Sequence, residues 1–130
     1  MDRALQAKRL FSDGFNCSQA VLTVFAEDFG LERTNALRLA CGFGGGMRMG
    51  GPCGAVSGAC MAIGLKYGKI RAEDNEARDR TYALVKELAV RFRSLHGTVL
   101  CRDLIGCNIS TSQGYEEAIQ KGVFLDICPK

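Results

Sequence analysis

Apolar residues recur at helical spacing through most of the chain, and glycines stand where the apolar stretches end. Such stretches run from Ala4 to Phe11, from Cys17 to Gly30, and through Leu37 to Ala40, the last with Thr34 or Asn35 as its cap. Intervals of three or four residues between apolar positions are typical of amphipathic helices, and no stretch shows the alternation of a half-buried strand. The pattern therefore predicts an all-α protein of five to seven helices, with residues 1–130 in a single domain.

Two longer helices are expected in the middle of the chain. In the first, from Gly51 to Tyr67, Gly54, Gly58 and Ala62 lie on one stripe that lets another backbone approach closely. The second runs from Glu73 to Leu95, and we expect it to pack against the helices that start at Cys17 and Pro52. Large apolar side chains on these helix faces are the expected core: Val21, Val24, Phe25, Leu84, Leu88 and Phe92.

Capping patterns place two cysteines at helix starts. Asn16 and Gln19 form a capping-box pattern, which puts Cys17 in the first turn of its helix. Pro52 is read as lying just inside the next helix, where proline is well tolerated, and this would put Cys53 in a first turn as well. Thr98 is a candidate cap for a short helix from Cys101, and a polar helix is expected from Ser110 onward.

The charge balance excludes some partners. Seventeen basic and 14 acidic residues give a formal charge of +3, and no basic run is long enough for a nucleic-acid tail or patch. The N-terminal segment lacks the apolar core of a secretory signal, and Ala55–Leu65 is shorter than the ~20 residues that a membrane span needs. We therefore expect a cytoplasmic protein that neither binds nucleic acid nor inserts into a membrane.

The glycine cluster does not form a nucleotide-binding motif. Read as G-x-G-x-x-G from Gly42 or Gly44, the pattern meets a methionine in its last position, and Gly68-Lys69 lacks the rest of a phosphate-binding loop. Backbone N–H groups at Gly50, Gly51 and the following helix start remain candidates for binding an anion or a thiolate. The lone His96 is assigned to a helix end, and no nucleophile lies beside a base in a recognisable motif.

Seven cysteines are the strongest chemical signal. Their odd number and the absence of an export signal argue against a disulfide scaffold, and none forms C-x-x-C. Cys17 and Cys53 share a helix-start environment that favours the thiolate. Cys41 and Cys60 are interpreted as small core residues.

Four separated segments resemble one known family. These are "GFNCSQAV" from Gly14, "GGPCGAVSG" from Gly50, "CRDLIGC" from Cys101 and "CPK" at the end. Together they resemble the redox-active proteins named for a C_GCAxxG_C_C cysteine pattern. The most specific part is CGAxxG, which includes Cys53, Gly54, Ala55 and Gly58.

The resemblance implies a site made of four cysteines. The family's signature positions fall on Cys17, Cys53, Cys101 and Cys128, while Cys107 is a secondary thiol. A similar domain in a multi-haem cytochrome is thought to hold an iron–sulfur cluster with four cysteines, but the absence of C-x-x-C-H here argues against haem. We expect the four thiols to converge, in one chain or across a homodimer, and to suit an iron–sulfur cluster better than zinc.

These observations lead to a functional hypothesis with two alternatives. The hypothesis is an electron carrier or redox sensor that works with an unidentified redox partner and does not itself transform an organic substrate. The first alternative is a metal-free thiol–disulfide redox protein in which Cys17 and Cys53 form a reversible disulfide. The second is a metal-free module that binds a small ligand or a partner.

Overall fold

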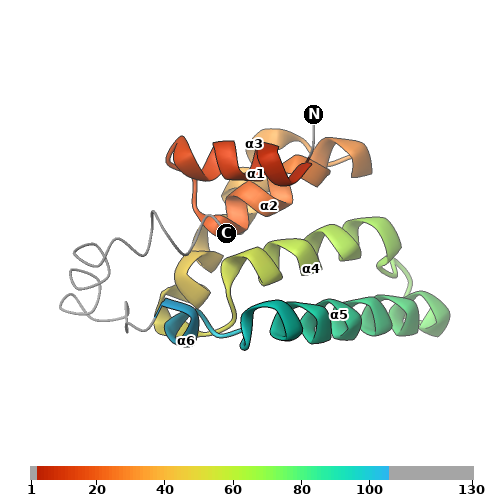
Figure 1. Cartoon of the computed structure of the whole chain (residues 1–130). Coiled ribbons are helices and arrows are strands. Elements are labelled where there is room, and N and C mark those ends of the chain that lie inside the picture. The colour runs from red at the N-terminus through yellow and green to blue at the C-terminus, as the bar shows by residue number, and fades with distance from the viewer. Residues whose placement is uncertain (1–2, 106–130) are drawn as a thin grey trace.

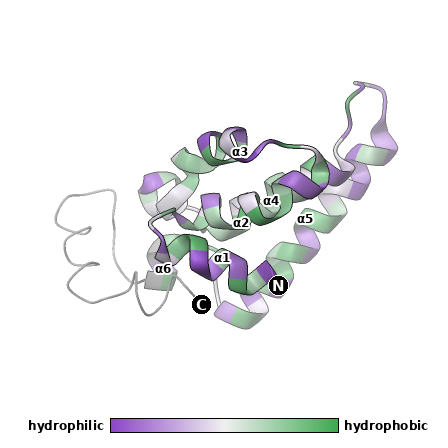
Figure 2. Cartoon of the chain, turned by 90° about the horizontal axis from the view of Figure 1, so that it is seen from above, coloured by the Kyte–Doolittle hydropathy of each residue, from purple (hydrophilic) through white to green (hydrophobic). Residues whose placement is uncertain are grey.

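Helix α2 (Cys17–Ala26) lies at the centre of the fold, between α1 and α3 (Figure 2). It also packs across α4. Helix α5 runs along α4 on the side away from α1, so that α4 forms a middle layer (Figure 1). The computed structural model describes residues 3–105. Its α-helices have these bounds: α1 Arg3–Ser12, α2 Cys17–Ala26, α3 Arg33–Ala40, α4 Gly54–Tyr67, α5 Asn75–His96 and α6 Cys101–Ile105.

Short helical turns join these helices. A 3₁₀ turn, Glu27–Phe29, continues α2 to Gly30, which adopts the left-handed conformation that the sequence predicts there. A second 3₁₀ turn, Cys41–Phe43, and a wide turn, Gly46–Gly50, lead from α3 to α4. Six α-helices in the described range confirm the predicted all-α class, and no helix there is long and apolar enough to cross a membrane.

Small residues make the core. Leu22, Ala26, Ala36, Ala40 and Ala62 form the buried cluster where α2, α3 and α4 meet. Alanine keeps the helix axes close, and the larger side chains of Phe25, Phe29, Leu31 and Met61 pack around the cluster. Among the residues that the structure describes, Leu22 is the largest side chain that is fully buried, at 1% exposure.

The predicted core of large apolar side chains is therefore wrong in its details. Val21, Val24 and Phe25 are only half-buried, and α5 contributes no fully buried residue. Leu84, Leu88 and Phe92 are half-buried, whereas Leu95 is 79% exposed. Among residues 3–105, α5 is the outer layer and lies against α4, so the other described helices cover only one side of its apolar stripe.

Side-chain caps begin two of the helices, α2 and α5, and two other helix starts differ from prediction. Helix α5 starts after Asp74, whose side chain accepts the Ala77 N–H, and ends at left-handed Gly97. Helix α3, however, begins at Arg33, and its N-cap Glu32 makes no side-chain capping bond, so Thr34 and Asn35 are inside the helix. The other exception is the start of α4, which bears on the cysteine site.

Candidate functional site

A capping box positions Cys17 as the first residue of α2. The Asn16 side chain accepts the Gln19 N–H at 2.9 Å, and the Gln19 side chain accepts the Asn16 N–H at 3.0 Å. The same two side chains also donate to the carbonyls of Cys41 and Leu37. The predicted first-turn position of Cys17 is thus confirmed, and its helix start is fastened to the end of α3.

A short antiparallel bridge positions Cys53 and Cys101. Pro52 pairs with Leu100, the Cys53 N–H donates to the Val99 carbonyl at 2.6 Å, and the Cys101 N–H donates to the Gly51 carbonyl at 2.7 Å. Pro52 therefore precedes α4 and is not inside it, contrary to the prediction. Cys53 is the N-cap residue, because its backbone is extended in the bridge.

The thiol of Cys53 donates a hydrogen bond to the sulfur of Cys17. Backbone N–H groups of Gly45, Ser18 and Gly54 point to the same sulfur, so donors from α2, from α4 and from the glycine-rich turn surround it. The Cys53 hydrogen bond is the largest effect, and together with the three N–H groups it outweighs burial. The pKa of Cys17 falls from its ordinary value of 9.0 to about 6.

The partner thiols remain protonated. The hydrogen bond to Cys17 raises the pKa of Cys53, as do burial and the negative charge of Cys17, although the Ala55 N–H opposes them. Burial and the Cys17 charge raise the pKa of Cys101 to about 11. Cys17 has three backbone donors where Cys53 has one, so the negative charge rests on Cys17.

The glycines of the CGAxxG segment make room for this sulfur and for α2. A Cβ atom at Gly54 would overlap the Cys17 Sγ and would lie 3.0 Å from the Phe43 carbonyl oxygen. A Cβ atom at Gly58 would lie 2.8 Å from the Ser18 carbonyl oxygen. The predicted close approach of another helix is confirmed, and Gly54 also has a direct part in the thiol site.

The glycine-rich segment before α4 is a tight left-handed turn. Gly45, Gly46, Met47 and Arg48 have φ values between 58° and 67°. This conformation costs L-residues about 1–2 kcal/mol each, so Met47 and Arg48 are strained. The Gly51 N–H closes the turn on the Gly46 carbonyl at 3.0 Å, and Gly50 is buried with a φ of 73°.

Of the N–H groups singled out from the sequence, the one at the start of α4, on Gly54, donates to the Cys17 sulfur, whereas that of Gly51 does not. Gly51 donates within the turn, whereas Gly45 and Ser18, which the analysis of the sequence did not single out, donate to the thiolate. Ser18 follows Cys17 at a capped helix start, a position where free N–H groups are expected, and this signal could have identified it. For Gly45, nothing in the glycine run distinguishes it from its neighbours.

The remaining cysteines lie apart from this site or outside the described residues. Cys41 is exposed, so its predicted core position is wrong: it follows α3 in the 3₁₀ turn, which faces solvent. Cys60 is half-buried in α4, and burial raises its pKa. The predictions for Cys107 and Cys128, and for a helix after Ser110, concern positions outside residues 3–105.

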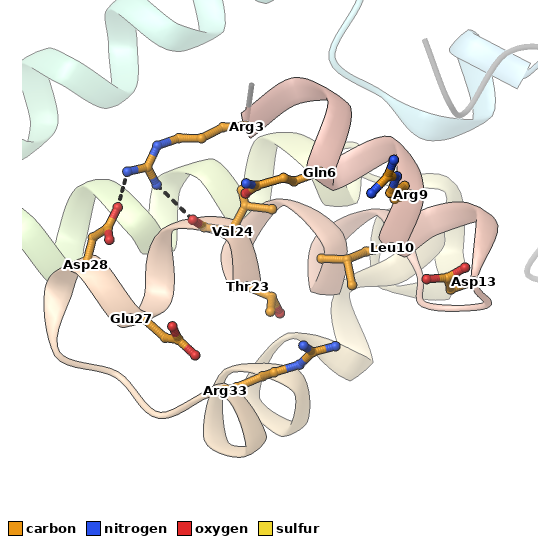
Figure 3. A pocket seen from close by; sticks show the side chains of 10 residues that line it. All are labelled: Arg3, Gln6, Arg9, Leu10, Asp13, Thr23, Val24, Glu27, Asp28 and Arg33. Atoms are coloured by element: carbon orange, nitrogen blue, oxygen red, sulfur yellow. Dashed lines mark hydrogen bonds and ion pairs between the residues drawn. The ribbon is translucent and has the colours of Figure 1, made fainter. Parts of the chain in front are cut away.

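A polar cleft of about 520 Å³ lies on another part of the molecule, between α1, α2 and the start of α3 (Figure 3). Three arginines and three acidic residues line it, so the cleft has no net charge to select an ion. Arg3 donates to the Val24 carbonyl at 2.8 Å and pairs with Asp28. The cleft contains no cysteine, and nothing links it to the thiol chemistry.

Residues 15–130 match the sequence profile of a family described as "Putative redox-active protein (C_GCAxxG_C_C)". The chain belongs to this family. No functionally curated protein and no solved structure matches it. The C_GCAxxG_C_C description names redox activity, and three of the four cysteines that the sequence resemblance assigned to the pattern, Cys17, Cys53 and Cys101, are neighbours in the structure.

These three cysteines do not by themselves fit a metal ion. Among residues 3–105, no group of three or more histidine, cysteine or acidic side chains has an arrangement that could hold one. A metal-bound C_GCAxxG_C_C site would therefore need a different arrangement of these thiols or ligands from outside the described range.

Proposed function

We propose that the protein is a thiol–disulfide redox protein in which Cys17 is the attacking thiolate and Cys53 the resolving thiol. The observation that carries the proposal is the hydrogen bond from the Cys53 thiol to a Cys17 sulfur that three backbone N–H groups also surround. A thiolate is the nucleophile in thiol–disulfide exchange, and a thiol in direct contact can complete the reaction. The family description as redox-active agrees with this chemistry.

The exchange consumes one disulfide and forms another. The Cys17 thiolate attacks one sulfur of a partner disulfide, which forms a mixed disulfide and releases the partner's other sulfur as a thiolate. That thiolate takes the proton of Cys53. The Cys53 sulfur then attacks Cys17 and releases the second partner sulfur, so two electrons pass from the protein to the partner and a Cys17–Cys53 disulfide remains.

The partner in this proposal is a disulfide-bearing protein or small molecule, and the protein carries the two electrons without transforming an organic substrate. In a reducing compartment such as the cytoplasm, the pair rests as a thiolate and a thiol. Cys101 interacts with Cys17 through charge alone, without the hydrogen bond that joins Cys53 to it, so Cys53 is the resolving thiol and Cys101 remains outside the exchange.

Trapping the mixed disulfide with glutathione disulfide as the probe tests the proposal. We expect the reduced wild type to form a Cys17–Cys53 disulfide, which peptide mapping by mass spectrometry identifies. Cys53→Ser should accumulate glutathione on Cys17, and Cys17→Ser should form neither product. Cys41→Ser is the matched control, because Cys41 is an exposed thiol outside the pair, and this variant should behave as the wild type does.

Two results would overturn the proposal. In the first, glutathione attaches elsewhere while Cys17 and Cys53 remain reduced. In the second, anaerobically purified protein contains iron with sulfide, or zinc, and Cys17→Ser and Cys53→Ser lose it. That result would support the cluster or metal that the resemblance implies, with Cys17, Cys53, Cys101 and Cys128 as its ligands.

A further inference from the structure

The side chain of Asn16 makes one bond more than a helix cap requires. Its Oδ1 accepts the Gln19 N–H at 2.9 Å, and aspartate, serine or threonine could cap the helix in the same way. Its Nδ2 also donates to the Cys41 carbonyl at 2.9 Å. Of these four residue types, only asparagine has a donor and an acceptor on separate atoms. Asparagine is therefore suited to a second task, which is to join the residue before Cys17 to the turn that follows α3.

Gly44 leaves room for the Asn16 side chain. A Cβ atom at Gly44 would lie 2.6 Å from the Asn16 Nδ2 and 2.8 Å from the Asn16 Cβ. The φ of Gly44, −63°, is one that any residue adopts, so the backbone conformation does not require glycine there. A Cβ atom at Gly42, two residues earlier, would meet nothing within 4 Å. The Asn16 side chain therefore lies in a slot between the Gly44 backbone and the Cys41 carbonyl, and this slot fixes its direction.

The sulfur of Cys17 has an equally restricted position. A Cβ atom at Gly54 would overlap the Cys17 Sγ, so the sulfur lies against the backbone of α4. Cys17 directly follows Asn16 and is the first residue of α2, so no preceding turn of the helix holds it. A rotation of this helix start would move the sulfur along α4 and away from the Cys53 thiol. The bonds that fix Asn16 therefore also keep the two thiols together.

We propose that Asn16 is a positioning residue for thiol–disulfide exchange, which holds the start of α2 so that the Cys17 sulfur stays in contact with the Cys53 thiol. The inference rests on the proposed function, because the step that Asn16 accelerates is closure of the disulfide, in which the Cys53 sulfur attacks Cys17 and releases the partner sulfur. The side chain has two separable roles. Its bond to Gln19 caps the helix, whereas its bond to Cys41 positions the sulfur.

The variant Asn16→Asp separates these roles. Aspartate caps a helix as well as asparagine does, so the midpoint of urea denaturation should change little. It has no donor for the Cys41 carbonyl, and we expect the Cys17–Cys53 disulfide to form about tenfold more slowly with glutathione disulfide, since misplaced groups react slowly. Iodoacetamide quenches the reaction, and peptide mapping measures the disulfide at each time point. Asp74→Asn is the matched control, because it exchanges the same two residue types at the cap of α5, and its rate should equal that of the wild type.

Gly44→Ala disturbs the same slot without changing Asn16 or adding charge. Its methyl group would overlap the Asn16 amide, so the disulfide should again form about tenfold more slowly. Gly42→Ala is the matched control, because its methyl group meets no neighbour, and it should react as the wild type does. Circular dichroism establishes that each variant is folded.

Wild-type rates in both Asn16→Asp and Gly44→Ala would overturn the positioning role. A slow rate in Asn16→Asp alone would overturn it too, since the added charge would then explain the effect. Failure of the wild type itself to form the Cys17–Cys53 disulfide would instead overturn the proposed function, and this role with it.

Discussion

The reactivity of Cys17 depends on donors that belong to three different segments of the chain. Ser18 supplies one from its own helix, Gly54 one from α4 and Gly45 one from the left-handed turn, while the Cys53 thiol supplies the strongest. No short motif contains all four donors. A nearly identical local sequence around Cys17 would therefore be an ordinary thiol in another fold.

The pH dependence of alkylation should reveal the Cys17 thiolate. At pH 7 a pKa of about 6 makes about nine-tenths of Cys17 thiolate, against about 1% for an ordinary cysteine. Because nucleophilicity falls with pKa, by roughly twentyfold over this range, we expect iodoacetamide to react only several-fold faster than with an ordinary thiol. The decisive measurement is the midpoint of the rate against pH, which should lie near 6 for Cys17. A midpoint near 9 would contradict the assignment.

Gly54→Ala should disturb the same sulfur directly. The new Cβ would overlap the Cys17 Sγ and displace it from its N–H donors, so the pKa of Cys17 should move back toward its ordinary value. The measurement is the alkylation midpoint of the variant. Gly64→Ala in the same helix is the control, because nothing lies within 4 Å of its Cβ, and it should leave the midpoint unchanged.

At the scale of elements, the crossing of α2 and α4 decides which substitutions matter. Gly58 places the α4 backbone against the Ser18 carbonyl, and Leu22 fills the centre of the cluster beside it. Helix α5, although longer, covers only the outer side of α4. The length of a helix is therefore a poor guide to its share of the core here.

Alanine substitutions in these helices should differ in cost. We expect Leu22→Ala to lower the free energy of unfolding by about 2–5 kcal/mol, because Leu22 is fully buried. Leu88→Ala should cost less than Leu22→Ala, since Leu88 is half-buried in the outer layer. Urea denaturation followed by circular dichroism measures both. A larger loss for Leu88→Ala would show that α5, not α2, holds the core.

Gly58→Ala tests the helix crossing itself. Its Cβ would lie 2.8 Å from the Ser18 carbonyl oxygen, so the helices must separate, at a cost of about 1–3 kcal/mol. Gly64→Ala again serves as the control. It should be neutral or stabilising by up to about 1 kcal/mol, because alanine favours the helix and meets no neighbour. Similar denaturation midpoints for the two variants would contradict the close crossing.

The sequence allowed prediction of the helices better than of their packing. Capping residues such as Asn16 and Asp74 act within one turn, so the starts of α2 and α5 follow from local chemistry. Helix α2 carries apolar residues on more than one side, so its sequence does not reveal that Leu22, and not Val21, faces the centre. The start of α4 was misplaced because the pairing of Pro52 with Leu100 is a distant contact.

In the candidate site, too, the sequence indicated which residues take part but not how the fold arranges them. The resemblance singled out Cys17, Cys53, Cys101 and Cys128. The structure places the first three together, and Cys128 lies outside the described residues. Which sulfur carries the charge could not be predicted, because the answer depends on N–H groups from Gly45 and Gly54, which only the folded chain brings to Cys17. Cys41 was misassigned because a small apolar residue after a helix has no local sign of its exposure.

At the scale of the whole molecule, the charged thiolate couples stability to pH. The pKa of Cys17 is lower in the folded protein than its ordinary value of 9.0, so folding favours loss of this proton. The contribution of Cys17 to the free energy of unfolding should therefore rise between about pH 6 and pH 9, and be lost as pH falls through 6. Above pH 9 Cys53, whose pKa is raised, should act in the opposite direction.

Denaturation midpoints measured from pH 5 to pH 9 under reducing conditions test this coupling. The increase in stability from about pH 6 to pH 9 should be present in the wild type and in Cys41→Ser. It should be smaller or absent in Cys17→Ser. Only the slope against pH matters, so a general loss of stability in Cys17→Ser does not affect the comparison. An unchanged slope in Cys17→Ser would show that other groups cause the rise.

The bridge between Pro52 and Leu100 also determines when the thiol site is completed. Its two segments are separated along the chain by α4 and α5, and they meet only after these helices fold back on each other. Bringing such distant segments together costs chain entropy. This cost is lower once α4 and α5 have packed against each other as an antiparallel pair. Cys17 and Cys53 are synthesised well before Val99, so a growing chain has both thiols but not the bridge. We therefore expect full reactivity of the Cys17 sulfur only after this bridge has formed.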